Sequence, residues 1–337
     1  MRVWFNRTFS SLHGALSMIK QGDPDRVYTL VYSASDPHPA ICAECDEVLP
    51  EPADLKGEAY VDWCVETARQ QHIDIFVPGR EARLISTVAD RFRAAGVRVL
   101  NAGSSETLVA LHDKARFYQD VDCPAAPAPD FLACTTLDEF DLAVQQLARN
   151  ARDVCIKPAQ SVFGIGFRRI RTDRSAYDIL MSGDPYSIDL HSLRHALSRR
   201  TSFPTMLVME YLNGPEFSVD CLADQGRIVV AVPRRKEATR QFIDAREDIQ
   251  DACRQIINQY ALNGFINIQF REGERGMRVL EVNARMSGGI AMAAQAGVNL
   301  PYLGLRGFDK GYATLQVPQV RFGTAVFERN VAGVILS

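Results

Sequence analysis

The sequence predicts a mixed protein, α/β and α+β, in which a parallel α/β domain is followed by a small domain and a larger mixed-sheet domain. Three observations lead to this fold class. The first third alternates strand-like and helix-like segments, a proline-rich stretch then interrupts the pattern, and several strands follow in quick succession. The chain also has 337 residues, more than one compact core usually holds, so two or three lobes are expected.

Short β-branched and aromatic runs predict the strands of the first domain, which we place at residues 1–111. From Glu81 to Ala95 apolar residues recur at helical spacing, and Gly96 suits the end of that helix. The GxGxxG fingerprint of dinucleotide-binding folds is missing. The predicted strands are Val3–Phe5, Val27–Tyr32, Ile73–Val77 and Val97–Leu100.

A small second domain is predicted over residues 112–204. Three prolines in Cys123–Asp130 exclude a helix there and indicate a semi-rigid linker. A glycine-bearing loop is expected at Ala159–Gly166. The predicted elements are strands near Phe131, at Val154–Lys157 and at Phe167–Ile170, and a helix at Leu137–Leu147.

A larger third domain is predicted over residues 205–337. Asn213-Gly214 and Gln225-Gly226 supply turns between its strands. The predicted strands are Thr205–Glu210, Phe217–Leu222, Ile228–Val232, Phe265–Phe270 and Met277–Asn283, with a helix at Asp244–Tyr260 and two short strands in Val320–Ser337.

Composition and charge exclude several classes of protein. Hydrophobic residues make up 47% of the chain and charged residues 23%, which is typical of a globular protein. The net charge of −3 offers no basic footprint for nucleic acid. No apolar stretch reaches the about 18 residues of a membrane helix, and Met1–Lys20 lacks the apolar core of a secretory signal. We therefore expect a cytoplasmic protein with reduced cysteines that binds neither nucleic acid nor membranes.

The strongest chemical signal lies on the last two predicted strands. Glu281 and Asn283 are two residues apart, so in a strand they face the same way, and a neighbouring strand can bring Gln269 alongside. Mg²⁺ bound with phosphate prefers such oxygen ligands. Arg285 would place a guanidinium next to the same phosphates. A plain hairpin with a polar solvent face explains these two strands equally well.

Two lysines point to a phosphate clamp. Lys114 begins a predicted helix, and Lys157 ends an apolar strand just before the glycine loop. A lysine beside a loop that closes over a ligand suits phosphate binding, although either lysine alone is more often a solvated surface charge. Glu210 and Glu216 flank a turn, where they accept hydrogen bonds from ribose hydroxyls or simply face solvent.

In this order, these pieces resemble the ATP-grasp superfamily over roughly Lys114 to Gly289. The segment EVNAR at residues 281–285 is similar to the branch that contains carbamoyl-phosphate synthetase and biotin carboxylase, and NIQF at 267–270 is a further match. The resemblance implies an ATP-grasp fold with an N-terminal pre-ATP-grasp domain, a small lid and a larger domain, with ATP between the last two.

The resemblance also implies a role for each candidate residue. Arg285 and Lys157 act on the transferred phosphoryl group and the acyl phosphate. The implied ATP ligands are Lys114 and Lys157 at the phosphates, Ser161, Gly164 and Gly166 in the covering loop, Glu210 at the adenine and Glu216 at the ribose. The implied ligands of Mg²⁺, or alternatively Mn²⁺, are Gln269, Glu281 and Asn283. Arg234 or Lys236 lies where some relatives have another phosphate- or substrate-contacting cation. The sequence departs from the family pattern in two places: its loop has fewer glycines than that of many relatives, and the neutral Gln269 stands where an acid is usual.

The implied reaction is an ATP-dependent ligation. A small-molecule carboxylate is activated as an acyl phosphate and attacked by an amine, which gives an amide or peptide-like bond, ADP and phosphate. Phosphoryl transfer requires positioning and charge neutralisation more than a protein nucleophile, which agrees with these residues. The alternatives are phosphorylation or carboxylation of a small molecule, and a catalytically silent ATP-binding regulatory module. The candidates for the substrate pocket include Arg80, Glu81 and the Ser287–Gly289 turn, and Arg80 either pairs with a substrate carboxylate or caps the sheet edge. The oligomeric state stays open, and a homodimer is one alternative.

Overall fold

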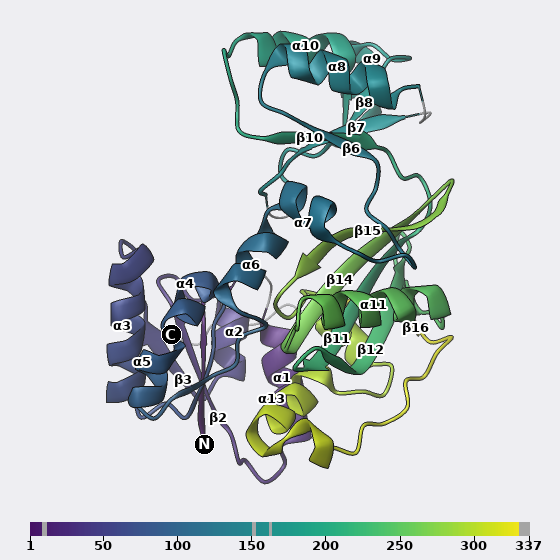
Figure 1. Cartoon of the computed structure of the whole chain (residues 1–337). Helices are drawn as coiled ribbons and strands as arrows, with labels where there is room; N and C mark the ends of the chain where they lie inside the picture. Colours follow the sequence, from purple (N-terminus) through teal and green to yellow (C-terminus); the bar gives the residue numbers. More distant parts are fainter. Residues whose placement is uncertain (9–11, 150–152, 162–163, 330–337) are drawn as a thin grey trace. The chain divides into compact units, whose positions relative to one another are not determined.

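The computed structural model describes the chain except residues 9–11, 150–152, 162–163 and 330–337 (Figure 1). The chain divides into two compact units. The first consists of Met1–Val109, Pro215–Gln269 and Val282–Ser337, and the second of Ala110–Gly214 and Phe270–Glu281. Each unit is described by itself below, and the three domain boundaries expected from the sequence stay predictions.

The first unit opens with a five-stranded sheet in the order β3–β2–β1–β4–β5 among the described residues. Each neighbouring pair is parallel, which confirms the predicted parallel α/β architecture. Strands β2 and β3, which come next in the chain, lie on one side of β1, and β4 and β5 lie on the other. The direction in which the strand order runs therefore reverses between β1 and β4. The strands are β1 (Arg2–Asn6), β2 (Thr29–Ala34), β3 (Glu47–Pro50), β4 (Ile75–Val77) and β5 (Arg98–Val99).

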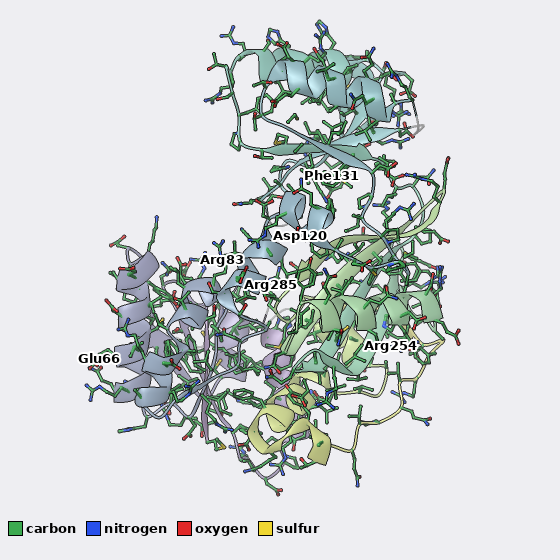
Figure 2. The ribbon with its side chains drawn as sticks, in the orientation of Figure 1. Glu66, Arg83, Asp120, Phe131, Arg254 and Arg285 are labelled. Atoms are coloured by element: carbon green, nitrogen blue, oxygen red, sulfur yellow. The ribbon has the colours of Figure 1, made fainter. Side chains whose placement is uncertain are left out.

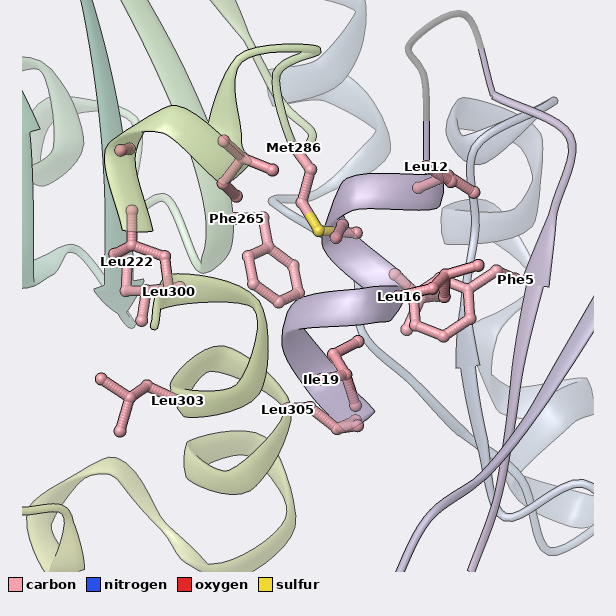
Figure 3. Packing of buried hydrophobic residues seen from close by; sticks show 14 of the residues in the cluster. Phe5, Leu12, Leu16, Ile19, Leu222, Phe265, Met286, Leu300, Leu303 and Leu305 are labelled. Atoms are coloured by element: carbon pink, nitrogen blue, oxygen red, sulfur yellow. The ribbon is translucent and has the colours of Figure 1, made fainter. Parts of the chain in front are cut away.

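Alternating side chains of β1 supply the two faces of this sheet. Trp4 stacks on Phe76 with ring centroids 4.2 Å apart, in the core beneath α3 (Gly57–Gln70) and α5 (Ala89–Ala94). Phe5 points to the opposite core, where it packs with Leu16 of α1 (His13–Gly22), as Figure 3 shows. A strand buried on both faces is what a parallel sheet covered by helices requires.

The helix predicted from Glu81 to Ala95 is broken in two, so this part of the prediction is wrong. The pieces are α4 (Ala82–Thr87) and α5, and Val88 between them has φ −117° and ψ 23°. The Thr87 hydroxyl donates to the Leu84 carbonyl oxygen at 2.7 Å, three residues back. Such side-chain bonds compete with the helical hydrogen-bond ladder, which accounts for the break here.

The six-stranded sheet has the strand order β15–β14–β11–β12–β13–β16 in the part of the chain described, and its pairs β11/β12, β12/β13 and β13/β16 are antiparallel. Its polar turn, Gln225-Gly226, has positive φ at both residues (48° and 81°), as a two-residue hairpin turn requires. Residues 330–337 of the predicted C-terminal strands lie outside the described chain. The strands are β11 (Glu216–Asp224), β12 (Arg227–Lys236), β13 (Gln241–Ile243), β14 (Gly264–Gly273), β15 (Gly276–Asn283) and β16 (Ala325–Val326).

Three helices accompany this sheet. Helix α11 (Glu247–Gln259) buries an apolar face and leaves Arg254 exposed to solvent, as Figure 2 shows. Helices α12 (Ile290–Ala294) and α13 (Leu300–Lys310) were not predicted; α13 contributes Leu300, Leu303 and Leu305 to the core around Phe265 (Figure 3).

The second unit contains a sheet in the order β6–β10–β7–β8–β9, with α8 and α10 packed together on it (Figure 1). Strand β10 belongs here, antiparallel to β6 and β7, although the sequence grouped it with the strands that follow it. The Thr136 capping box starts α8 at the predicted residue. The elements are α7 (Lys114–Asp120), β6 (Phe131–Cys134), α8 (Leu137–Leu147), β7 (Val154–Pro158), β8 (Arg168–Arg171), α9 (Ala176–Ser182), β9 (Ser187–Asp189), α10 (Leu190–Ser198) and β10 (Met206–Glu210). Helix α6 (Ser105–His112) begins in the first unit and ends in the second.

Gly304→Ala in α13 should destabilise the protein although alanine is the better helix former. A methyl group on Gly304 would lie 2.3 Å from Cε1 of Phe265 and 2.8 Å from Cδ2 of Leu222. Overpacking costs about 1–3 kcal/mol, which exceeds the about 1 kcal/mol gained in helix propensity. Urea denaturation should show a lower free energy of unfolding, partly restored by adding Phe265→Leu. A single variant as stable as the wild type would contradict this packing.

Candidate active site

Two lysines and one carboxylate come together in the second unit. Lys114 is the first residue of α7, where the Asp113 side chain caps the helix. Its Nζ lies 3.5 Å from Oε2 of Glu281 and donates to the Ser161 carbonyl oxygen at 3.2 Å. Lys157, on β7, donates from Nζ to the Tyr118 hydroxyl at 2.7 Å. The sequence-predicted lysines and Glu281 are thus brought to one place.

The cluster carries more positive than negative charge. Lys114 is 7% exposed and Lys157 9%. Burial lowers the pKa of both ammonium groups below 10.5, and the nearby Glu281 carboxylate opposes this effect at each. Lys157 lowers the pKa of Lys114 further. Among the described residues, the Glu281 carboxylate acts on both lysines and the Asp113 carboxylate on Lys114, and an anionic ligand beside the two ammonium groups would stabilise their charged forms further.

Tyr118 holds this arrangement, and sequence reasoning did not assign it a role. Its hydroxyl accepts from Lys157 and donates to the Leu280 carbonyl oxygen at 2.6 Å, so it joins β7 to the residue before Glu281. Burial raises the pKa of Tyr118 well above its ordinary value, so it stays a neutral donor. A signal was available, because Tyr118 follows Lys114 by four residues and shares its helix face.

The predicted covering loop begins directly after Lys157, and residues 162–163 lie outside the described chain. Gly166 has φ 82°, and a Cβ there would lie 2.7 Å from Cγ and Cδ of Pro158. Only glycine therefore fits this close approach to the residue after Lys157. Gly164 also has positive φ, 67°, whereas its Cβ would meet open space.

The candidate metal ligands lie on neighbouring strands of the six-stranded sheet. Glu281 and Asn283 are two apart on β15, so their side chains share a face, and Gln269 is on β14. The described residues contain no group of three or more His, Cys, Asp or Glu placed to hold a metal. The donor set is thus one carboxylate and two amide oxygens, which fits a hard cation that takes its remaining ligands from phosphate and water.

Arg285 follows β15 by two residues (Figure 2). Its Nη2 donates to Oδ1 of Asn283 at 3.4 Å, and its Nη1 donates to the Met286 carbonyl oxygen at 3.2 Å. The guanidinium is therefore held beside a candidate metal ligand, and its expected contact with phosphates stays a prediction.

Glu210 and Glu216 each have cationic partners. Glu210 accepts from Arg275 at 3.1 Å and from Arg278 at 3.4 Å, and its carboxylate also accepts the Asp130 N–H. Glu216 pairs with Lys236. Their expected contacts with adenine and ribose stay predictions, and Glu210 would have to share its carboxylate with these arginines.

Two further arginines have structural partners. Arg80 donates to Glu51 at 2.8 Å and lies over the Tyr60 ring at 4.1 Å, which favours its alternative role at the sheet edge. Arg234 is 2% exposed and pairs with Asp220 at 2.7 Å. Its proposed contact with phosphate or substrate is therefore wrong, because the guanidinium is enclosed by protein.

The first unit has a cavity at the carboxyl ends of β1 and β4, where its strand order reverses. Asn6 and Gly79 mark these strand ends, and Arg285 reaches the same cavity. Ligands of open parallel sheets bind at such a point. The Oδ1 atom of Asn101, which also lines the cavity, is buried and has no hydrogen-bond partner among the described residues.

Comparison with known proteins identifies the fold. The family described as "ATP-grasp in the biosynthetic pathway with Ter operon" matches residues 202–331. The L-amino acid ligase of Bacillus licheniformis superposes with a TM-score of 0.62 and 16% identity, over 92% of this chain and 74% of the ligase. The chain therefore has an ATP-grasp fold, and residues 202–331 match an ATP-grasp family.

Further ATP-grasp relatives are similarly distant in sequence. The biotin carboxylase domain of Hydrogenobacter thermophilus 2-oxoglutarate carboxylase, a complex with MgADP and bicarbonate, gives a TM-score of 0.66 and 14% identity over 96% of this chain and 73% of that domain. The arginine-specific carbamoyl phosphate synthase large chain of Bacillus subtilis (strain 168) is 23% identical over 241 residues. That match covers 66% of this chain but 21% of the synthase.

These likenesses establish the ATP-grasp fold of the chain. Across the described residues, none of the helices is long and apolar enough to span a membrane.

Lys157→Met should stabilise the protein without ligand at neutral pH. The pKa of Lys157 is lower in the folded chain than its ordinary 10.5. The unfolded chain therefore binds this proton more tightly, and wild-type stability rises with pH between the folded-state pKa and 10.5. Denaturation at several pH values should show the advantage of the variant shrinking across that window.

Lys56→Met, at an exposed position, is the matched control and should show no such trend. If Lys157→Met is less stable than wild type at neutral pH, the contacts of Lys157 with Tyr118 outweigh the burial of its charge.

Proposed function

We propose that this chain binds ATP with Mg²⁺ and uses it to activate a small carboxylate as an acyl phosphate, which an amine then attacks. The observation that carries the proposal is the buried excess of positive charge at Lys114 and Lys157 beside Glu281. A polyphosphate compensates such charge, whereas a neutral ligand does not. The ATP-grasp fold and the MgADP bound by a structural neighbour support the same assignment.

In this proposal the two lysines bind the phosphates and spread the charge that develops during transfer. Tyr118 keeps Lys157 in place through its hydroxyl. Mg²⁺, when bound by Glu281, Asn283 and Gln269, would neutralise the phosphate oxygens. Arg285 orients the carboxylate and the acyl phosphate, since a guanidinium matches both planar groups.

The cavity in the first unit supports a substrate of limited size with an apolar portion. Val77, Leu108 and Phe265 form apolar parts of its wall, while Arg285 and Asn101 supply a cation and an unpaired acceptor. We place the substrate carboxylate toward Arg285. Asn101 would accept a hydrogen bond from an N–H or O–H of the same molecule, because a buried acceptor without a partner is costly.

A carboxylation is the second candidate, because a bicarbonate-bound biotin carboxylase domain is among the structural neighbours. Bicarbonate in place of the organic carboxylate would give a carboxyphosphate, and the amine would be carboxylated. The same lysines, arginine and Mg²⁺ would serve both reactions, so bicarbonate must be among the substrates tested.

Glu281→Ala should abolish Mg-dependent ATP turnover. The change removes the carboxylate from the candidate metal set and also leaves Lys114 without its anion. ADP release should be measured with a panel of amino acids, small carboxylates, amines and bicarbonate, and we expect a loss of at least about 100-fold in kcat. Product analysis of the active combination separates ligation from carboxylation.

Glu274→Ala is the matched control, since Glu274 is exposed in the turn before the same strand. It should retain wild-type turnover. Calorimetric binding of Mg-ATP without any turnover across the panel would favour a regulatory module, and absence of binding would refute the proposal.

A further inference from the structure

Arg234 is a buried cation with protein groups on every side of its guanidinium. It lies on β12, and its side chain and that of Asp220 on β11 are each 2% exposed. Nε and Nη2 donate to the same Asp220 oxygen at 2.9 and 2.7 Å, and Nη1 donates to Gln241. Arg234 therefore cannot reach a ligand, and its charge must serve another purpose.

The second oxygen of Asp220 is occupied as well. Asn267, on β14, donates from Nδ2 to Oδ1 of Asp220 at 3.0 Å and to Oγ of Ser218 at 2.9 Å. Strands β14, β11 and β12 are consecutive neighbours in the sheet, so this cluster crosses all three. A fully hydrogen-bonded network of this kind rigidifies its surroundings and fixes the direction of the guanidinium.

Arg234 contacts the turn over residues 287–289 and holds it in place. Its Nη2 donates to Oγ of Ser287 at 3.2 Å, and the same oxygen accepts the Gly289 N–H at 3.2 Å. A Cβ on Gly289 would lie 2.5 Å from Nη1 and 2.7 Å from Nη2 of Arg234. Gly289 has an ordinary φ of −94°, so close contact with the guanidinium, not backbone strain, requires glycine here.

The turn begins at Ser287, two residues after Arg285, and the residue between them, Met286, is buried. Met286 is 6% exposed and packs into the core beside Phe265, as Figure 3 shows. The segment is therefore held by an apolar side chain at Met286 and by the buried cation at Ser287 and Gly289. Arg285 projects from a stretch of chain that is fixed immediately after it.

We propose that Arg234, oriented by Asp220, is a positioning residue that fixes the turn over 287–289 and thereby the place of the Arg285 guanidinium. The catalytic consequence rests on the proposed function, in which Arg285 meets the substrate carboxylate and the acyl phosphate. The mechanical part does not, because it concerns contacts made without any ligand. A purely structural ion pair would instead stabilise the whole sheet evenly.

Ser287→Ala tests the mechanical part while leaving the Asp220–Arg234 pair intact. Hydrogen exchange of the full chain without nucleotide should become about fivefold faster in residues 286–291, as expected for losing one hydrogen bond. Exchange in α11 and β12 should be unchanged. Unaltered exchange in 286–291, or equal acceleration across β12, overturns the proposal whatever the activity.

Adjacent glycines give a matched pair. Gly289→Ala drives a methyl group into Arg234, whereas Gly288→Ala adds the same group where nothing lies within 4 Å. Exchange in residues 286–291 should be faster for Gly289→Ala than for Gly288→Ala. Equal effects would mean that contact with Arg234 does not hold the turn, which contradicts the proposal.

Turnover tests the catalytic consequence. With Mg-ATP and the active acceptor pair, Ser287→Ala should lower kcat about tenfold and leave the KM for ATP unchanged, as expected for a misplaced catalytic group. In an Arg285→Lys background, Ser287→Ala should have no further effect. If Ser287→Ala lowers kcat by the same factor in the Arg285→Lys background as in the wild type, Arg234 does not act through Arg285. If the wild type never releases ADP, the proposed function fails, and the exchange result still decides whether Arg234 holds the turn.

Discussion

The buried surplus of positive charge at Lys114 and Lys157 is the constraint on which the candidate site depends. Two ammonium groups less than 10% exposed share one carboxylate, Glu281, and burial lowers the pKa of both. A fold selected for stability alone would avoid this arrangement, because unpaired buried charge opposes folding. Tyr118, the Ser161 carbonyl and the Gly166 approach to Pro158 all keep the lysines where they are.

The two arginines that sequence reasoning placed near the ligand differ in their surroundings, and this difference gives them different roles in the account. Arg285 lines a cavity and donates to the Met286 carbonyl oxygen at 3.2 Å and to Asn283 at 3.4 Å. Arg234 is enclosed by Asp220, Gln241, Ser218 and Ser287. A buried, saturated guanidinium fixes backbone, whereas one facing a cavity can meet a substrate. This difference supports the proposals that Arg285 contacts the substrate and that Arg234 positions the turn beside it.

Sequence periodicity predicted the elements whose signals are local. Helix α8 was predicted at its observed bounds, and the structure shows a capping box of Thr136 and Glu139 that fixes its start. Strands β14 and β15 were predicted because a polar turn separates two apolar runs. The family resemblance, not periodicity, assigned roles to Lys114 and Lys157.

What sequence could not supply depends on tertiary contacts. Strand β10 follows the pattern of β11 and β12, yet its partners are β6 and β7, a choice that no local signal records. The break at Val88 depends on hydroxyl bonds that a hydrophobic pattern does not show. The burial of Arg234 requires Asp220, Asn267 and Ser287 from three separate segments, which the resemblance to relatives with a ligand-contacting cation did not show.

Proton uptake on nucleotide binding tests the central claim most directly. Burial lowers the pKa of both lysines and a polyphosphate beside them opposes this effect, so Mg-ATP binding should raise their pKa. Calorimetric titration in buffers of different ionisation enthalpy gives the number of protons taken up. The account predicts uptake that increases as the pH rises above neutral and is reduced in Lys157→Met. Binding of Mg-ATP without uptake at any pH, or no binding, would contradict it.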